Sequence, residues 1–199
     1  MDWTLENRGG EEIYGESIYT NRWELFGIYQ LPVQEIVNLQ VSANGHKQNS
    51  VYGNTSYFAD QYIGFAQLTW NKPLNAHDFM FGVSYRYNYY DDNTPATSDA
   101  LQTNEPSITH LPGVFVQDEI KINESNKLLM GLRYDYNSIH GSILSPRINY
   151  KWNSKDQKNI IRLSVGNGYR VANVFTEDHA ALSGAREVVF EEELAPETS

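Results

Sequence analysis

The chain has 199 residues and a formal net charge of −10, from 25 acidic and 15 basic side chains. This charge argues against a nucleic-acid-binding protein, because phosphates require a basic surface. The sequence contains no cysteine, which excludes disulfides, thiolate metal sites and cysteine nucleophiles.

Alternating patterns of apolar and polar residues predict about eight long strands. Successive side chains of a strand point to opposite faces, so a half-buried strand alternates in sequence. We expect an all-β fold, with these strands forming an antiparallel meander. In chain order, the predicted strands cover residues 22–30, 34–45, 57–70, 78–90, 113–123, 127–138, 142–152 and 158–170.

The first and third strands alternate with interruptions, and the second and fourth are regular. Val37, Leu39 and Val41 share one face of the second strand, whereas Phe26 and Phe65 fall among polar residues of the first and third. In residues 79–89 every odd position is apolar or aromatic, and the even positions are mostly small or polar. The pattern therefore predicts one apolar and one polar face for the sheet.

The last four strands repeat this scheme, with one charged exception. Asp118 stands among the apolar positions of strand 113–123. Because a charge at the middle of a bilayer is costly, we expect Asp118 to lie near a membrane interface or to bond a tyrosine hydroxyl on the next strand.

Three features favour a transmembrane β-barrel over a soluble β-sandwich. The strands are roughly 9–14 residues long, as in a tilted spanning strand, whereas soluble strands cluster near 5–6. Aromatic residues gather toward strand ends, as in an interfacial girdle. Short turns alternate with longer connections, and we expect outer loops at residues 46–56, 91–112 and 171–193.

Five motifs in order resemble the barrel of TonB-dependent outer-membrane receptors. A departure at Asn173, where the family often has proline, resembles receptors of the Bacteroidetes. The motifs are Gln117-Asp118-Glu119, Gly131-Leu132-Arg133-Tyr134-Asp135, Ser145-Pro146-Arg147, Gly166-Asn167-Gly168-Tyr169-Arg170 and Leu194-Ala195-Pro196-Glu197-Thr198-Ser199.

The resemblance implies a wall of a barrel of about 22 strands that is filled by an N-terminal plug. It also implies TonB-energised uptake of a scarce solute, namely siderophore-iron, cobalamin, haem or an oligosaccharide, across the outer membrane of a Gram-negative bacterium. The expected partners are outer-membrane lipid, the remaining strands, the plug, TonB through that plug, and the small-molecule solute. We find neither a plug nor a signal peptide in the sequence, and expect an internal fragment.

No pattern predicts a catalytic site, a metal site or a cofactor. The arginines on the predicted polar face are expected mainly to pair with lumen carboxylates, and solute contacts are expected in the long loops. Candidate solute-binding residues are Arg86, Tyr90, Asp91, Asp92, His110, Arg170, Glu177 and His179.

Two alternatives remain open at this point. One is a small outer-membrane barrel with a structural or adhesin role, which would need about eight strands that close. The other is a soluble ligand-binding β-domain, which would need polar outward faces. The apolar row from Phe79 to Tyr89 argues against the second alternative.

Overall fold

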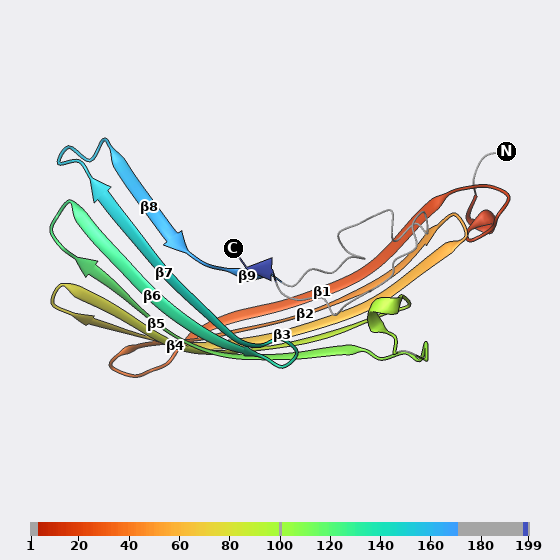
Figure 1. The fold of residues 1–199 in the computed structure, drawn as a ribbon, viewed down its shortest axis with the longest axis horizontal. Helices are drawn as coiled ribbons and strands as arrows, with labels where there is room; N and C mark the ends of the chain where they lie inside the picture. The colour runs from red at the N-terminus through yellow and green to blue at the C-terminus, as the bar shows by residue number, and fades with distance from the viewer. Residues whose placement is uncertain (1–3, 100, 171–196, 199) are drawn as a thin grey trace.

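The structure, a computed structural model, describes residues 4–99, 101–170 and 197–198. Eight antiparallel strands form one sheet in chain order, so that each strand pairs with the next (Figure 1). The all-β meander predicted from sequence is therefore confirmed. The strands are β1 (Glu16–Gln30), β2 (Ile36–Tyr52), β3 (Thr55–Leu74), β4 (His77–Asp92), β5 (Ser107–Lys121), β6 (Asn126–Asn137), β7 (Gly141–Asn153) and β8 (Ile160–Gly166).

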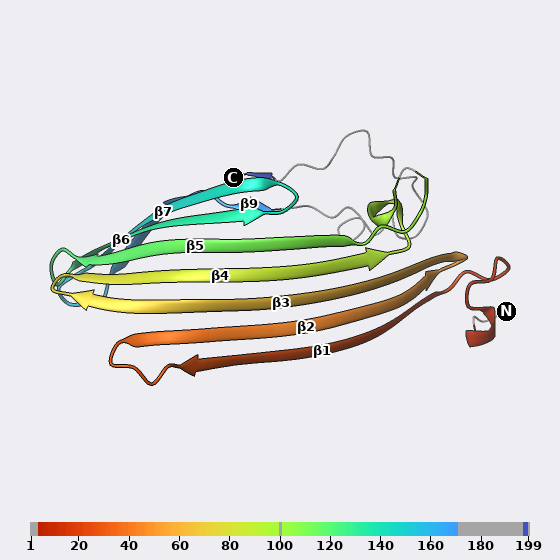
Figure 2. The ribbon, with the colours of Figure 1, turned by 90° about the horizontal axis from the view of Figure 1, so that it is seen from below.

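Four short elements accompany the sheet. They are the 3₁₀ helices η1 (Leu5–Asn7) and η2 (Pro95–Thr97), and the strands β9 (Tyr169–Arg170) and β10 (Glu197–Thr198), which pair with each other. Neither described helix has the length and apolar character needed to cross a membrane. The sheet bends along its strands into a trough, and β9 lies on the concave side (Figures 1 and 2).

Cross-strand register divides the sheet into an apolar and a polar face. Residues directly opposite each other in neighbouring strands point to the same side. One continuous row across the six strands β2–β7 contains only large apolar or aromatic residues, each 36–56% exposed. The row from β2 to β7 is Leu39, Leu68, Val83, Val114, Tyr134 and Leu144.

 Tyr29 of β1 continues the row opposite Leu39.

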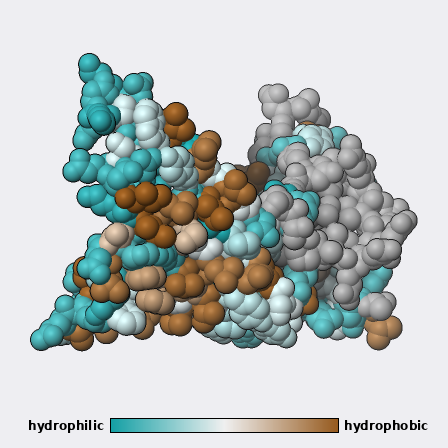
Figure 3. All heavy atoms as spheres, turned by 60° about the vertical axis from the view of Figure 1, so that its left-hand side comes forward, coloured by the Kyte–Doolittle hydropathy of each residue, from teal (hydrophilic) through white to brown (hydrophobic). Residues whose placement is uncertain are grey.

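This exposed apolar row has a direct physical consequence. Burying apolar surface gains roughly 25 cal/mol per Å², so a broad band of exposed large side chains is unfavourable in water and favourable against lipid. Figure 3 shows hydrophobic residues gathered in a patch with hydrophilic residues at its rim. The apolar face is thus suited to the hydrocarbon core of a membrane, as the alternation predicts.

The polar face is the concave one. Tyr169 of β9 lies within electrostatic reach of Arg86, Arg133 and Asp135, which all belong to the polar face. Because β9 lies inside the trough (Figure 1), these three side chains line its inner surface. A barrel that continued this sheet would therefore have an apolar exterior and a polar lumen.

The outer loop predicted at residues 46–56 is wrong. β2 and β3 continue through this segment and join by a turn at Gly53 and Asn54. Gly53 has a φ of +60°, which glycine adopts without strain. Polar residues such as Lys47 and Asn49 concealed this part of β2, because the strand extends beyond the apolar band, where both faces are polar.

Other predicted boundaries also shift. β1 begins at Glu16 rather than at residue 22, and β8 ends at Gly166 rather than at residue 170. The predicted loop 91–112 is shorter, because β4 reaches Asp92 and β5 begins at Ser107. The third predicted outer loop, 171–193, lies outside the described residues.

Candidate functional site

An arginine–aspartate pair forms a bidentate polar contact on the concave face. Arg133 donates from Nε to Asp135 at 2.6 Å and from its terminal nitrogen to the second carboxylate oxygen at 2.7 Å. The same arginine nitrogen reaches the hydroxyl of Ser84, two strands away, at 2.8 Å. Asp135 is only 2% exposed, so this bidentate partner is what makes its buried charge tolerable.

Glycines in the neighbouring strands make room for this pair. A Cβ on Gly113 would lie 2.0 Å from the Asp135 carboxylate, and a Cβ on Gly82 would lie 2.1 Å from the ring of Phe115. The Arg133 guanidinium in turn lies 5.6 Å from the centre of that ring. The glycines therefore let large side chains lie flat against the wall of the trough.

Two further arginines of the concave face have no carboxylate partner among the described residues. Arg86 lies 5.9 Å from the ring of Phe65, and Arg147 donates to the side-chain oxygen of Gln117. The expected pairing of lumen arginines with carboxylates thus holds for Arg133 alone of these three. Arg86 and Arg147 therefore place two positive charges on the concave face that no carboxylate of the described residues pairs.

A tyrosine cluster lies on the concave face near the β2–β3 turn. The hydroxyls of Tyr57 and Tyr90 are 2.9 Å apart, and Tyr90 donates to Asp92 at 2.6 Å. Tyr57 packs with Tyr52 in the small buried core. Burial raises the pKa of Tyr57 above its usual value, and the nearby Asp92 carboxylate adds to the rise.

The Asp92 side chain stabilises the start of the β4–β5 connection through hydrogen bonds. Its carboxylate accepts from the backbone nitrogen of Thr94 at 2.9 Å and from the hydroxyl of Thr97 at 2.9 Å. The Thr97 hydroxyl also accepts from the Asp92 backbone nitrogen at 3.0 Å. These bonds fold the chain into η2, so the Asp92 oxygens are largely committed within the protein.

The predicted solute-binding residues do not form one site. Arg86, Tyr90 and Asp92 point to the concave face, whereas Asp91 and His110 share the opposite face. His110 lies within a strand rather than in the predicted loop, and its ring nitrogen is 2.7 Å from the Tyr85 hydroxyl. Arg170 forms a 3.8 Å ion pair with Glu197. Glu177 and His179 lie outside the described residues.

The expectation for Asp118 is met in position but not in partner. Its carboxylate lies 2.6 Å from the ring nitrogen of His77, the first residue of β4. The two-residue turn beside His77 marks the end of the sheet, which corresponds to an interface. The bonded group is thus a histidine on the neighbouring strand rather than a tyrosine hydroxyl.

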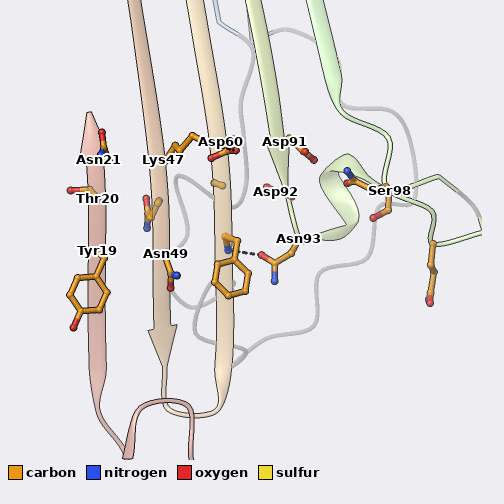
Figure 4. Close-up of a pocket in the computed structure, with 15 residues that line it drawn as sticks. Tyr19, Thr20, Asn21, Lys47, Asn49, Asp60, Asp91, Asp92, Asn93 and Ser98 are labelled. Carbon is orange, nitrogen blue, oxygen red and sulfur yellow. Dashed lines mark hydrogen bonds and ion pairs between the residues drawn. The ribbon is translucent and has the colours of Figure 1, made fainter. Parts of the chain in front are cut away.

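A pocket of about 760 Å³ lies where β1–β4 extend beyond the apolar band (Figure 4). Lys47 bonds Asp60 at 3.2 Å, and Asn93 accepts from the Phe58 backbone nitrogen at 2.7 Å. Lys47, Asp60 and Asp91 belong to the convex side by register. A solute in this pocket would therefore lie outside the trough.

No group of three or more metal-ligating side chains occurs in the part of the chain that the structure describes. Asp91 and Asp92 point to opposite faces, which prevents the two carboxylates from meeting at one cation. Sequence reasoning missed Ser84, Phe115 and Tyr57. Alternation could assign these residues to the polar face, but their neighbours depend on the register between strands.

Comparisons with known proteins point to one family. The family model described as TonB dependent receptor-like, beta-barrel, matches residues 5–199. Two proteins from Vibrio cholerae serotype O1 strains, each named iron-regulated outer membrane virulence protein, are 26% identical over 175 residues. The match covers 87% of this chain and 25% of each relative, so the chain spans about a quarter of their length.

Solved structures share the fold. The siderophore receptor PirA from Acinetobacter baumannii has a TM-score of 0.57 at 13% identity, over 79% of this chain and 26% of that protein. A mutant of the ferric enterobactin receptor PfeA from Pseudomonas aeruginosa, in complex with enterobactin, has a TM-score of 0.58 at 11% identity, over 80% and 27%. At these identities the likeness concerns the fold alone.

Proposed function

The chain belongs to the TonB-dependent receptor family, as part of its outer-membrane β-barrel, and from this premise we propose that it is one wall of a receptor for uptake of an iron chelate. The observation that carries the proposal is the family match over residues 5–199. The two-faced sheet supports it, because a receptor wall needs lipid on one side and a polar lumen on the other.

The names of the relatives favour an iron chelate over the other solutes that this family imports. The two Vibrio cholerae proteins are named as iron-regulated. Arg86 and Arg147 also leave uncompensated positive charge on the concave face, which suits an anionic chelate. The uptake experiment described below distinguishes an iron chelate from haem, cobalamin and oligosaccharides.

Uptake through this wall would need parts of the receptor besides this sheet. β1 and β8 have free edges in the sheet order, and unpaired edges of this length invite further strand pairing. We infer that the remaining barrel strands pair there, that a plug domain fills the lumen, and that TonB acts on this plug. We propose no catalytic role for the wall.

The test uses the full-length receptor gene in its own host. Cells that lack the gene should lose uptake of one radioactive ferric chelate, and the gene should restore uptake only when TonB is present. Restored uptake of cobalamin or an oligosaccharide instead would overturn the iron proposal. Unchanged uptake of every solute class in the deleted strain would overturn the receptor proposal itself.

A further inference from the structure

The pocket outside the trough has a row of two aromatic rings and an amide on its floor. Tyr19 of β1 lies directly opposite Asn49 of β2 (Figure 4), and Asn49 lies opposite Phe58 of β3, so the three side chains share the convex face. Arg8 lies over the Tyr19 ring, 5.1 Å from its centre, and donates to the Asn49 side chain. The Phe58 ring is 44% exposed and lines the pocket, so it is open to a ligand.

A polar row lies beside the aromatic one, two residues nearer the apolar band. Lys47 bonds Asp60 at 3.2 Å, and the Asp60 side chain is still 41% exposed. Asp91 lies directly opposite Asp60 on the next strand. On the convex side, the cations Lys47 and Arg8 thus balance the two carboxylates. The pocket therefore favours an uncharged ligand that exchanges hydrogen bonds with these groups.

The β4–β5 connection, residues 93–106, forms a wall of the pocket. The Asn93 side chain accepts from the backbone nitrogen of Phe58 at 2.7 Å, which fixes the start of the connection against β3. The Asp99 carboxylate accepts from the backbone nitrogens of Leu101 and Thr103 at 2.9 and 2.8 Å. A wall held by such bonds lowers the entropic cost of binding a ligand. Residues of the connection that line the pocket are Asn93, Ser98, Gln102 and Asn104.

The pocket lies directly beyond one aromatic edge of the apolar band, on the same face. On β3 the convex positions from Trp70 to Tyr62 span roughly 26 Å at 3.3 Å per residue, comparable to a lipid-facing band about 25 Å tall. The Tyr62 ring lies 5.9 Å from that of Tyr89 on β4. Asp60 and Phe58 are the next two convex positions of β3. A ligand in the pocket is therefore at the level of lipid headgroups.

The pocket belongs to the outer side of the membrane. Its wall, residues 93–106, is the longest connection between neighbouring strands of the eight-stranded sheet. Barrels of the outer membrane carry their long loops outward and their short turns toward the periplasm. The outer leaflet of this membrane contains glycolipids, whose heads are sugars. A glycolipid beside this wall has its acyl chains along the apolar band and its head beside the pocket.

A sugar ring matches the chemistry of the pocket. Its C–H face packs on an exposed aromatic ring, which Phe58 provides. Each of its hydroxyls both donates and accepts a hydrogen bond, and the Asp60 carboxylate and the Asn21 amide offer partners on the floor. The volume of about 760 Å³ lies within the usual range of small-ligand sites.

We propose that this pocket binds an uncharged sugar in the head of an outer-leaflet glycolipid whose acyl chains lie along the apolar band. The site goes beyond the proposed function, because it lies on the convex face and does not touch a solute inside the trough. It gives the wall a specific lipid partner at the cell surface, in addition to the unspecific contact of the apolar band with lipid.

Binding to the full receptor in phospholipid nanodiscs tests the proposal. The receptor would be freed of glycolipid by detergent exchange and titrated with three probes. They are the intact glycolipid of the same outer membranes, the oligosaccharide released from it by mild acid, and the remaining lipid part. Native mass spectrometry gives the bound copies and the dissociation constant. We expect the intact glycolipid to bind more tightly than either of its parts.

Variants of the floor locate the site. Phe58→Ala should weaken binding of the intact glycolipid about tenfold, whereas Phe58→Trp keeps a ring and should bind as the unmodified receptor does. Tyr136→Ala is the matched control, because Tyr136 is 50% exposed on the same face but lies on β6, outside the pocket. Urea midpoints measured on each variant separate a loss of binding from a loss of folding.

The charge of the ligand is tested at Asp60. Asp60→Asn should weaken binding of an uncharged sugar, because it replaces a carboxylate acceptor by a weaker one. The same change should tighten binding of a phosphate group, because it frees Lys47 from its partner. The two ligand chemistries therefore shift the dissociation constant in opposite directions, and the substitution is at an exposed position where folding does not depend on it.

Four outcomes would overturn the proposal. Equal binding of the intact glycolipid by Phe58→Ala and Tyr136→Ala would show that the pocket is not used, and tighter binding by Asp60→Asn would indicate an anionic group. Binding of the free oligosaccharide as tightly as the intact glycolipid would indicate a soluble glycan, and equally tight binding of the lipid part would exclude a role for the sugar. Uptake of ferric chelate is measured separately, so these results leave the proposed function untouched.

Discussion

Arg133, Asp135, Ser84 and Gly113 show how single residues shape the inner wall. The carboxylate of Asp135 occupies the space that a side chain at position 113 would fill, and two bonds from Arg133 hold it there. The charged pair thus lies flat instead of projecting into the trough. Gly113 is required by this close approach, since its own backbone conformation is not unusual.

Replacing Gly113 by alanine should destabilise the receptor by about 1–3 kcal/mol, the usual cost of overpacking. The new Cβ would lie 2.0 Å from Asp135 and force the carboxylate away from Arg133. Gly64→Ala is the matched control, because the nearest side-chain atom there is 4.0 Å away. Urea midpoints of the refolded receptor in detergent measure both; equal midpoints would contradict the account.

The tyrosine cluster predicts that the folded protein loses stability at alkaline pH. Burial raises the pKa of Tyr57 above 10.0, so the folded state holds this proton more tightly than the unfolded state does. Stability is therefore fully present below pH 10 and falls as pH rises above it. Tyr57→Phe should make the urea midpoint less sensitive to pH between about 10 and 12. A variant with the pH slope of the unmodified receptor would argue against this.

The alternation of the sequence predicted the face of each side chain better than its contacts. Alternation placed Arg133 and Asp135 together on the polar face, and their bond follows from that placement. It could not show that Ser84 lies beside them, because this contact spans two strands whose register is set by turns. The same limit separated His110 from Arg86, which were grouped as candidates but lie on opposite faces.

The strands differ in how far they extend beyond the apolar band. β2 continues for six residues past His46, about 20 Å at 3.3 Å per residue. Sequence patterns predicted the part of each strand that faces lipid, because only there does one face need apolar residues. They missed the extension and its tight turn, where solvent on both sides removes the constraint.

A charge on the apolar face should be far more costly than the same charge on the polar face. Leu39→Lys should lower stability by about 2–4 kcal/mol, since Leu39 lies in the central apolar row. Asn38→Lys is the matched control on the adjacent position and opposite face, and should cost much less. Folding of both variants into lipid vesicles, followed by urea unfolding, makes the comparison. Equal losses would contradict the assignment of faces.

Across the whole molecule, the sheet is a curved wall with different chemistry on its two sides. The convex side carries the apolar band, and the concave side carries the Arg133–Asp135 pair and the tyrosine cluster. This division was predictable from sequence because alternation encodes it directly. The curvature and the extended strand ends were not, because they depend on how the eight strands combine.

The most direct test of this account is the lipid exposure of alternate residues in β4. The sequence has no cysteine, so single cysteines introduced into the full receptor can each carry one spin label. In lipid vesicles, labels at Phe81 and Val83 should collide frequently with oxygen dissolved in the bilayer, and labels at Met80 and Asn88 should not. Equal oxygen accessibility at all four positions, or the reverse alternation, would contradict a membrane wall with an apolar convex face.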